Sequence, residues 1–200
     1  MRWGVAPSGS HYFAAFPFPF YNRLTAPDLA DLWAFLKRVP AVRQPNRAGH
    51  PLWFAALRNA VAVSVTPFPG PWRPDPERDA VWNRGAYLVA TVGRCGDCHT
   101  PRDWLGAPDR TRFLAGGSGN DGKPSPNITP DDATGIGSWS SDDIVNLLKT
   151  GQKPDFDFVG GAMGEIVDAT SKLTDADRHA IAVYLKSLPP IRSATAAKKE

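Results

Sequence analysis

Two segments of the chain share one pattern of polar and apolar positions. Residues 24–42 read LTAPDLADLWAFLKRVPAV, and residues 173–191 read LTDADRHAIAVYLKSLPPI. In each, a threonine can cap a helix N-terminus, an aspartate follows three residues later, and apolar residues recur at helical spacing before a proline. Two unrelated amphipathic helices could look alike, but the common register of cap, stripe and proline favours a duplicated module.

Two further helices are predicted between these copies. One covers residues 79–94, where Gly85 would weaken a helix unless another helix approaches closely at that point. A shorter one covers residues 141–149 and ends at Gly151.

The remaining segments are predicted to be irregular. Residues 101–140 are rich in Gly, Pro, Asp and Asn and are typical of surface loop, and the sequence GGAMG at 160–164 is typical of a flexible loop. Residues 52–65 fit a short helix or a strand equally well. The 20 prolines and 18 glycines among 200 residues agree with short helices joined by long connections.

Composition excludes several classes of protein. A net charge of +3 is too mild to indicate a nucleic-acid partner. The longest apolar stretch, residues 51–66, is interrupted by Arg58 and is shorter than the roughly 20 residues that cross a bilayer. No secretory signal is visible after Met1.

The sequence Cys95-Gly96-Asp97-Cys98-His99 contains both cysteines of the chain. A C-x-x-C-H motif is typical of covalent haem attachment, in which both thiols bind the porphyrin and the adjacent imidazole binds iron. The alternatives are a thioredoxin-like dithiol, which is expected beside a βαβ pattern that this chain lacks, a local disulfide, or half of a zinc site. Zinc would need two more ligands from three remaining histidines, so the motif favours haem.

Met163 is the only methionine besides Met1. A lone methionine is more often core filler, but here glycines on both sides would let the backbone approach a flat cofactor. Methionine–histidine ligation is typical of electron-transfer cytochromes, so we favour Met163 as a second iron ligand. His179 faces away from the apolar stripe of its helix and is predicted to be solvated.

Residues 79–191 resemble a complete class I cytochrome c domain, an all-α fold of short helices and long loops around one haem. The resemblance is closest to the multihaem cytochrome c subunits of membrane-associated bacterial alcohol, gluconate and aldehyde dehydrogenases. It rests on the motifs WNRGAYL at 82–88, CHTPR at 98–102, PNITP at 126–130, TGIG at 134–137, WS at 139–140 and AM at 162–163.

This resemblance implies one covalent haem c with iron, bound through Cys95 and Cys98 and ligated by His99 and Met163. It also implies that Gly85 and Tyr184 lie where the first and last helices cross. The residues it places around the haem pocket are Asn127, Ile128, Thr129 and Trp139.

The first part of the chain resembles only the end of a preceding cytochrome domain. Phe16 stands where the family commonly has a methionine, and no C-x-x-C-H precedes it. We therefore expect a fragment of a longer product: a C-terminal domain remnant at 1–42, a proline-rich connector at 43–78, a cytochrome c domain at 79–191 and a disordered tail at 192–200. His11 fits a distal ligand of the missing haem, but an ordinary loop histidine is the favoured interpretation.

The function implied by the resemblance is electron transfer without catalysis of its own. Electrons would come from the catalytic subunit of a dehydrogenase and pass to quinone or another cytochrome or respiratory carrier. The expected location is the periplasm or the outer face of the cytoplasmic membrane, with membrane association only through the complex. The alternatives are a haem enzyme (a peroxidase or a sulfur-compound dehydrogenase) and a non-redox interaction module.

Overall fold

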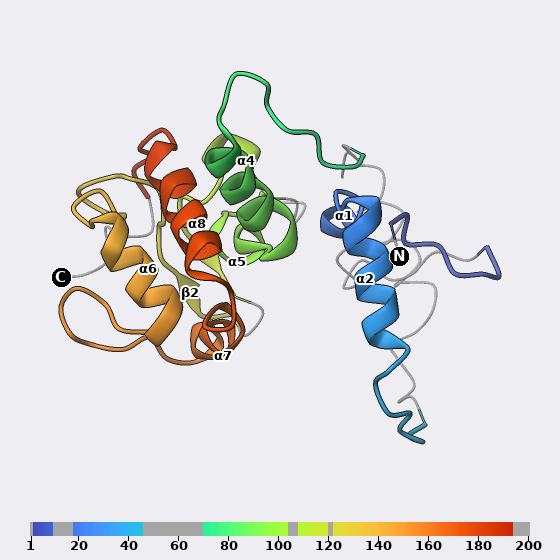
Figure 1. Cartoon of the computed structure of the whole chain (residues 1–200). Coiled ribbons are helices and arrows are strands. Elements are labelled where there is room, and N and C mark those ends of the chain that lie inside the picture. The colour runs from blue at the N-terminus through green and yellow to red at the C-terminus, as the bar shows by residue number, and fades with distance from the viewer. Residues whose placement is uncertain (1, 10–17, 46–69, 104–107, 120–121, 194–200) are drawn as a thin grey trace. The chain divides into compact units, whose positions relative to one another are not determined.

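The computed structural model describes residues 2–9, 18–45, 70–103, 108–119 and 122–193 (Figure 1). Internal contacts divide the chain into two compact units, Met1–Arg73 and Pro74–Glu200. The predictions made for His11, Phe16, residues 52–65 and the tail beyond residue 193 fall outside the described residues. In the described part of the chain, no helix is long and apolar enough to cross a membrane.

The first unit contains helices α1 (Phe18–Tyr21) and α2 (Ala26–Leu36). The predicted cap of α2 is confirmed, because the Thr25 hydroxyl accepts a hydrogen bond of 3.3 Å from the backbone N–H of Asp28. Between α1 and α2, Asn22 is buried and its Oδ1 accepts a hydrogen bond of 2.7 Å from the N–H of Gly70. No residue of α2 itself is buried, and Phe35 is 64% exposed.

The second unit is built from short helices joined by long irregular segments, as the sequence predicted. Its elements are α4 (Ala80–Tyr87), a π-helical turn η1 (Leu88–Val92), α5 (Cys95–His99), a 3-10 turn η2 (Arg110–Arg112), the two-stranded antiparallel pair β1 (Gly117–Ser118) and β2 (Pro124–Ser125), α6 (Ser141–Thr150), α7 (Ala162–Thr170) and α8 (Asp175–Ser187). This architecture agrees with the class I cytochrome c fold.

Helices α4 and α8 cross at Gly85, and α6 packs on another side of α8 (Figure 1). A Cβ atom at Gly85 would overlap the carbonyl oxygen of Ala180 and lie 2.8 Å from Cβ of Tyr184. Around the crossing, the Trp82 ring stands edge-on to Tyr184 with centroids 5.1 Å apart. The close helix approach predicted from Gly85 is therefore confirmed.

Helix α6 also agrees with its prediction. Ser140 and Asp143 form a reciprocal capping box at its start, and Gly151 ends it with a φ of 80°. The helix expected over 79–94 is wrong in its last part, since the α-helix ends at Tyr87 and a π-helical turn follows it. Arg94 then adopts a left-handed conformation, with φ of 51°.

Two loop predictions are wrong in part. The irregular segment 101–140 contributes core residues, because Leu114, Ala115 and Thr129 are fully buried. An irregular chain can be buried when its polar groups find partners, as the N–H of Leu114 does on the Thr100 hydroxyl at 3.0 Å. Met163 lies in the first turn of α7 rather than in a flexible loop.

Candidate functional site

The two cysteines and His99 form the short helix α5. Residues three apart in a helix lie on one face, so Cys95 and Cys98 are one turn apart on the same side. Both are free thiols and partly buried. One turn of helix therefore presents the thiols of Cys95 and Cys98, and the imidazole of His99 follows the second thiol directly.

The environment of Cys95 keeps its thiol neutral. Burial, followed by the nearby charge of Cys98, raises the pKa of the Cys95 thiol to about 11. A thioredoxin-like dithiol needs the opposite shift, since the thiolate is its nucleophile. The local electrostatics therefore disfavour the redox-dithiol interpretation of the motif.

A loop from the segment 113–118 holds α5 in place. A Cβ at Gly96 would lie 2.7 Å from a ring carbon of Phe113, so the aromatic ring packs directly on the backbone of α5. Gly117 comes equally close to α5 from β1, because a Cβ there would lie 2.6 Å from the Cys98 carbonyl oxygen. The His99 carbonyl accepts a hydrogen bond of 2.8 Å from the N–H of Gly116.

The imidazole of His99 is oriented by one backbone carbonyl. Its Nδ1 lies 2.8 Å from the carbonyl oxygen of Pro126, and this contact requires the proton on Nδ1. Burial lowers the pKa of His99, and the hydrogen bond to Pro126 opposes that shift in part. His99 is therefore a neutral imidazole whose Nε2 keeps its lone pair for a metal ion.

The loop that carries the Pro126 carbonyl is held by the side chain of the next residue. Asn127 is buried, and its amide donates to the Ile191 carbonyl at 2.7 Å and to the Thr134 hydroxyl at 2.9 Å. Its oxygen accepts from the backbone and the hydroxyl of Thr129 at 2.9 and 2.8 Å. All four bonds are internal, so Asn127 orders the loop that positions His99.

The other residues predicted for the site lie on separate segments. Ile128 is partly buried, and its N–H donates to the Leu114 carbonyl at 3.0 Å. Trp139 is partly buried, and its carbonyl accepts a bond of 2.7 Å from Lys186. Met163 is the second residue of α7 and is partly buried. The structure thus unites the thiols, His99 and the Pro126–Asn127 loop, while Met163 belongs to a helix of its own.

Two features of the site were missed by the sequence reasoning. One is the role of the Pro126 carbonyl, which no local pattern reveals. The other is Asp97, whose carboxylate pairs with Arg94 at 2.7 Å and with Arg102 at 2.8 Å. Two arginines flanking an acidic residue inside C-x-x-C-H were the available signal for this second feature.

The residues present fit a covalently bound haem. Two free thiols stand one turn apart, and the adjacent imidazole is neutral and held by a hydrogen bond at Nδ1, the ring nitrogen that would not bind the metal, as metal-binding histidines usually are. Clusters of three or more His, Cys, Asp or Glu side chains that could hold a metal ion are absent from the described ranges.

Comparison with known proteins identifies the family of the chain. The cytochrome c family model matches residues 83–189. A protein described as "Diheme cytochrome c-type" from Cereibacter sphaeroides is 39% identical over 96% of this chain and 64% of its own length. "Alcohol dehydrogenase (quinone), cytochrome c subunit" from Gluconacetobacter polyoxogenes is 38% identical over 96% of this chain and 43% of its own length.

A third relative, "Gluconate 2-dehydrogenase cytochrome c subunit" from Pantoea cypripedii, is 34% identical over 94% of this chain and 45% of its own length. The chain thus spans from less than half to less than two thirds of the length of these relatives. With a family model that matches more than half of its residues, the chain belongs to the cytochrome c family, which indicates covalent haem c with iron as its cofactor.

Proposed function

We propose that the domain at residues 79–191 binds one haem c and carries single electrons. Cys95 and Cys98 would form the two thioether bonds, and His99 and Met163 would be the axial ligands. The observation that carries this proposal is the state of His99. Its imidazole is neutral, its Nδ1 donates a hydrogen bond to the Pro126 carbonyl, and two free thiols precede it in the same helix. When bound, haem supplies an iron that takes up and releases one electron.

The protein groups would tune this chemistry by position and polarity. The Pro126 carbonyl fixes the ring orientation of His99 and raises its basicity as a ligand. The ion pairs of Asp97 with its two arginines would brace α5, so that the thiols keep their relative positions. A thioether as the second ligand raises the reduction potential relative to a second imidazole. Asn127, Ile128 and Trp139 are proposed to line the pocket.

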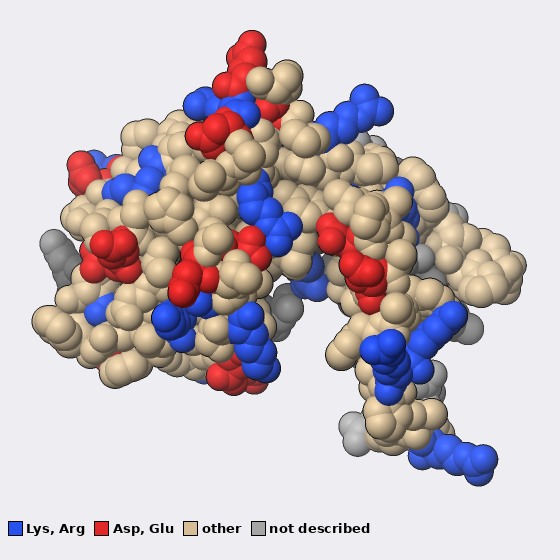
Figure 2. All heavy atoms as spheres, in the orientation of Figure 1, with Lys and Arg blue, Asp and Glu red and all other residues tan. Residues whose placement is uncertain are grey.

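We propose a place between a dehydrogenase and a respiratory acceptor. The catalytic subunit of a dehydrogenase would deliver one electron at a time, and quinone or another cytochrome would receive it. The names of the alcohol and gluconate dehydrogenase relatives support this order. On the visible face of the second unit, acidic and basic side chains are interspersed (Figure 2), which suits a transient docking surface.

The location follows from the proposed cofactor. Covalent haem attachment takes place on the outer side of the cytoplasmic membrane, so we propose the periplasm or that membrane face. Membrane association would come through the partner complex. Purification of the tagged chain from the membranes of its host, followed by addition of alcohols, gluconate or fructose, tests this: the substrate of the partner should reduce the haem.

The ligand assignment is tested by Met163→Ala in haem-loaded full-length chain. The ferric wild type should show the weak sulfur-to-iron charge-transfer band, and the variant should lose it, bind imidazole readily in the ferric state and bind carbon monoxide readily once reduced. Ile166→Ala is the matched control, because it shortens an exposed apolar side chain on the same helix. A wild type with a high-spin, five-coordinate spectrum would contradict the electron-carrier proposal and favour a haem enzyme. Failure to take up haem would favour a non-redox interaction module.

A further inference from the structure

We propose that Arg178 is a positioning residue for Met163. It lies on α8, where it clamps the C-terminal end of α7, and the opposite end of α7 carries Met163. This inference rests on the proposed function, because it assumes that Met163 ligates iron. It gives a role to a residue of the repeated segment 173–191 that the sequence pattern does not assign.

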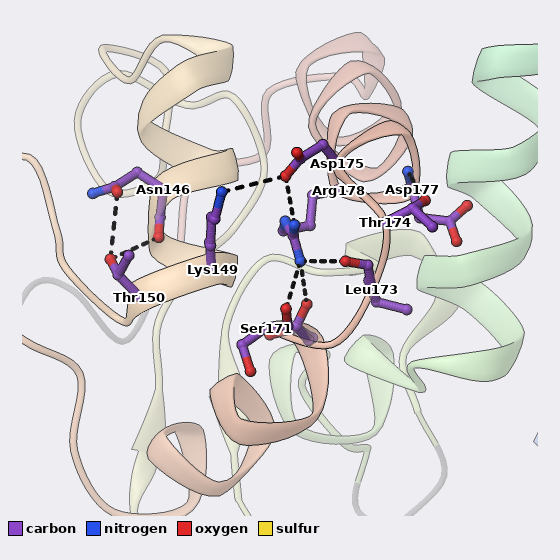
Figure 3. A network of polar contacts seen from close by, with 10 residues as sticks. Asn146, Lys149, Thr150, Ser171, Leu173, Thr174, Asp175, Asp177 and Arg178 are labelled. Carbon is purple, nitrogen blue, oxygen red and sulfur yellow. Dashed lines mark hydrogen bonds and ion pairs between the residues drawn. The ribbon is translucent and has the colours of Figure 1, made fainter.

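The guanidinium group of Arg178 binds three backbone carbonyls at once. Its side chain is 4% exposed. Its Nη1 donates to the carbonyls of Thr170, Ser171 and Leu173 at 3.0, 2.9 and 2.6 Å (Figure 3). Nη2 donates to Asp175 at 2.6 Å, which orients the planar group.

Arg178 provides hydrogen-bond partners for carbonyls at the C-terminal end of α7. The last carbonyls of a helix have no partner within the helix, and a positive charge is favourable there. Arg178 supplies both hydrogen bonds and charge in a buried place. A lysine has three donors on one nitrogen and could not hold three carbonyls and Asp175 in the same geometry.

The same end of α7 is also tied to α6. The Thr170 hydroxyl donates to the Leu148 carbonyl at 2.7 Å, and Val167 is the one buried residue of the helix. A Cβ at Gly151, which ends α6, would lie 3.6 Å from Val167. Two neighbouring helices therefore anchor the C-terminal half of α7.

The end that carries Met163 makes fewer contacts with the rest of the protein. Gly161 precedes the helix without a side-chain capping bond, and no protein atom from another segment lies within 4 Å of a Cβ placed at Gly160, Gly161 or Gly164. A helix of nine residues spans about 13 Å and is unstable by itself. Contacts at the far end of α7, among them the three hydrogen bonds from Arg178, therefore position Met163 relative to the rest of the protein.

A purely structural role for Arg178 makes a different prediction from a positioning role. Arg84 offers the matched control, because its guanidinium binds Asp177 on the same helix α8 at 2.7 and 3.0 Å. That contact joins α8 to α4 and does not involve α7. Loss of either arginine removes a charged contact of α8, but only Arg178 should affect Met163.

The test is an imidazole titration of haem-loaded full-length ferric protein, with loss of the sulfur-to-iron band as the signal. Imidazole competes with the methionine, so a loosened Met163 gives tighter apparent binding. We expect Arg178→Met to lower the apparent Kd about tenfold, which corresponds to the loss of roughly one charge-assisted hydrogen bond at the position of Met163. Asp175→Asn should shift it less in the same direction, and Arg84→Met should stay within about twofold of wild type.

Hydrogen exchange gives the second readout. The amides of α7 should exchange faster in Arg178→Met, while those of α5 and α6 keep wild-type rates. If Arg178→Met fails to fold, Arg178→Lys and the exposed Asp175→Asn replace it, and wild-type imidazole affinity in both would overturn the clamp. Equal affinities in Arg178→Met and Arg84→Met would also overturn it.

Failure of the underlying ligand assignment looks different. A wild type without the sulfur-to-iron band, or with a band that survives Met163→Ala, overturns the role of Met163 and the clamp together. If the wild type shows the band and Met163→Ala lacks it, Met163 is the ligand. If Arg178→Met then has the imidazole affinity of the wild type, the clamp alone is overturned.

Discussion

The crossing of α4 and α8 gives the sharpest prediction about stability, through the substitution Gly85→Ala. The added Cβ would overlap the Ala180 carbonyl oxygen and lie 2.6 Å from its carbonyl carbon and 2.8 Å from Cβ of Tyr184. Carbon atoms in contact ordinarily lie about 3.5–4.0 Å apart, so the helices must separate by about 1 Å. Because backbone atoms form the obstacle, no side-chain rotation relieves it.

Two opposing contributions set the magnitude. Alanine is favoured over glycine inside a helix by about 1 kcal/mol. Overpacking costs about 1–3 kcal/mol and sometimes more, and an obstacle made of backbone belongs at the upper end. A net loss of about 2 kcal/mol in the free energy of unfolding should follow, which corresponds to a Tm lower by about 8 °C for a domain of this size.

Thermal and urea unfolding of haem-loaded protein measure this loss. Val81→Ala is the control, because Val81 is an exposed residue of the same helix α4. That control should be unchanged or slightly stabilised, since alanine has the higher helix propensity. A Gly85→Ala protein as stable as Val81→Ala would refute the close helix crossing.

Two other substitutions test the loop and the charge pairs. Asn127→Ala should lower the free energy of unfolding by about 2–3 kcal/mol, because it leaves the buried carbonyl of Ile191 and the N–H of Thr129 without this partner; urea unfolding within about 0.5 kcal/mol of wild type would contradict it. Arg84 holds the pKa of the Asp177 carboxyl below its usual range. This pair therefore stabilises the fold above the unfolded pKa of aspartate, about 4, and the contribution is lost as pH falls through the lower folded pKa. Asp177→Asn should show a smaller acid-induced loss of stability than wild type in unfolding curves between about pH 5 and 2, and identical curves would count against the pair.

The two repeated segments show that a local sequence pattern predicts helix capping but not the burial of the helix. Thr25 and Thr174 both cap their helices through the N–H of an aspartate three residues on, as the sequence predicted. The same amphipathic pattern nevertheless has different surroundings. The stripe of α8 is buried at Ile181 and Leu185, whereas α2 has no buried residue. Capping depends on neighbours in sequence, but burial depends on what packs against the helix.

The missed helix α7 has a similar explanation. The glycines at 160, 161 and 164 lower the helix propensity around Met163, so a loop was the natural prediction. The helix forms because its C-terminal half is held by α6 and α8, through Thr170 and Arg178. Tertiary contacts of this kind outweigh weak local preference.

The sequence by itself determined the local chemistry of this protein: the attachment motif at 95–99, the helix caps and the glycine that ends α6. Each depends on residues within a few positions of one another. Only the tertiary structure decided which nitrogen of His99 is protonated, since Pro126 lies 27 residues away. It also decided why residue 85 must be glycine and what holds α7. The physical reason is that burial, carbonyl partners and backbone collisions come from segments far apart in the chain, and a linear pattern does not say which segments meet.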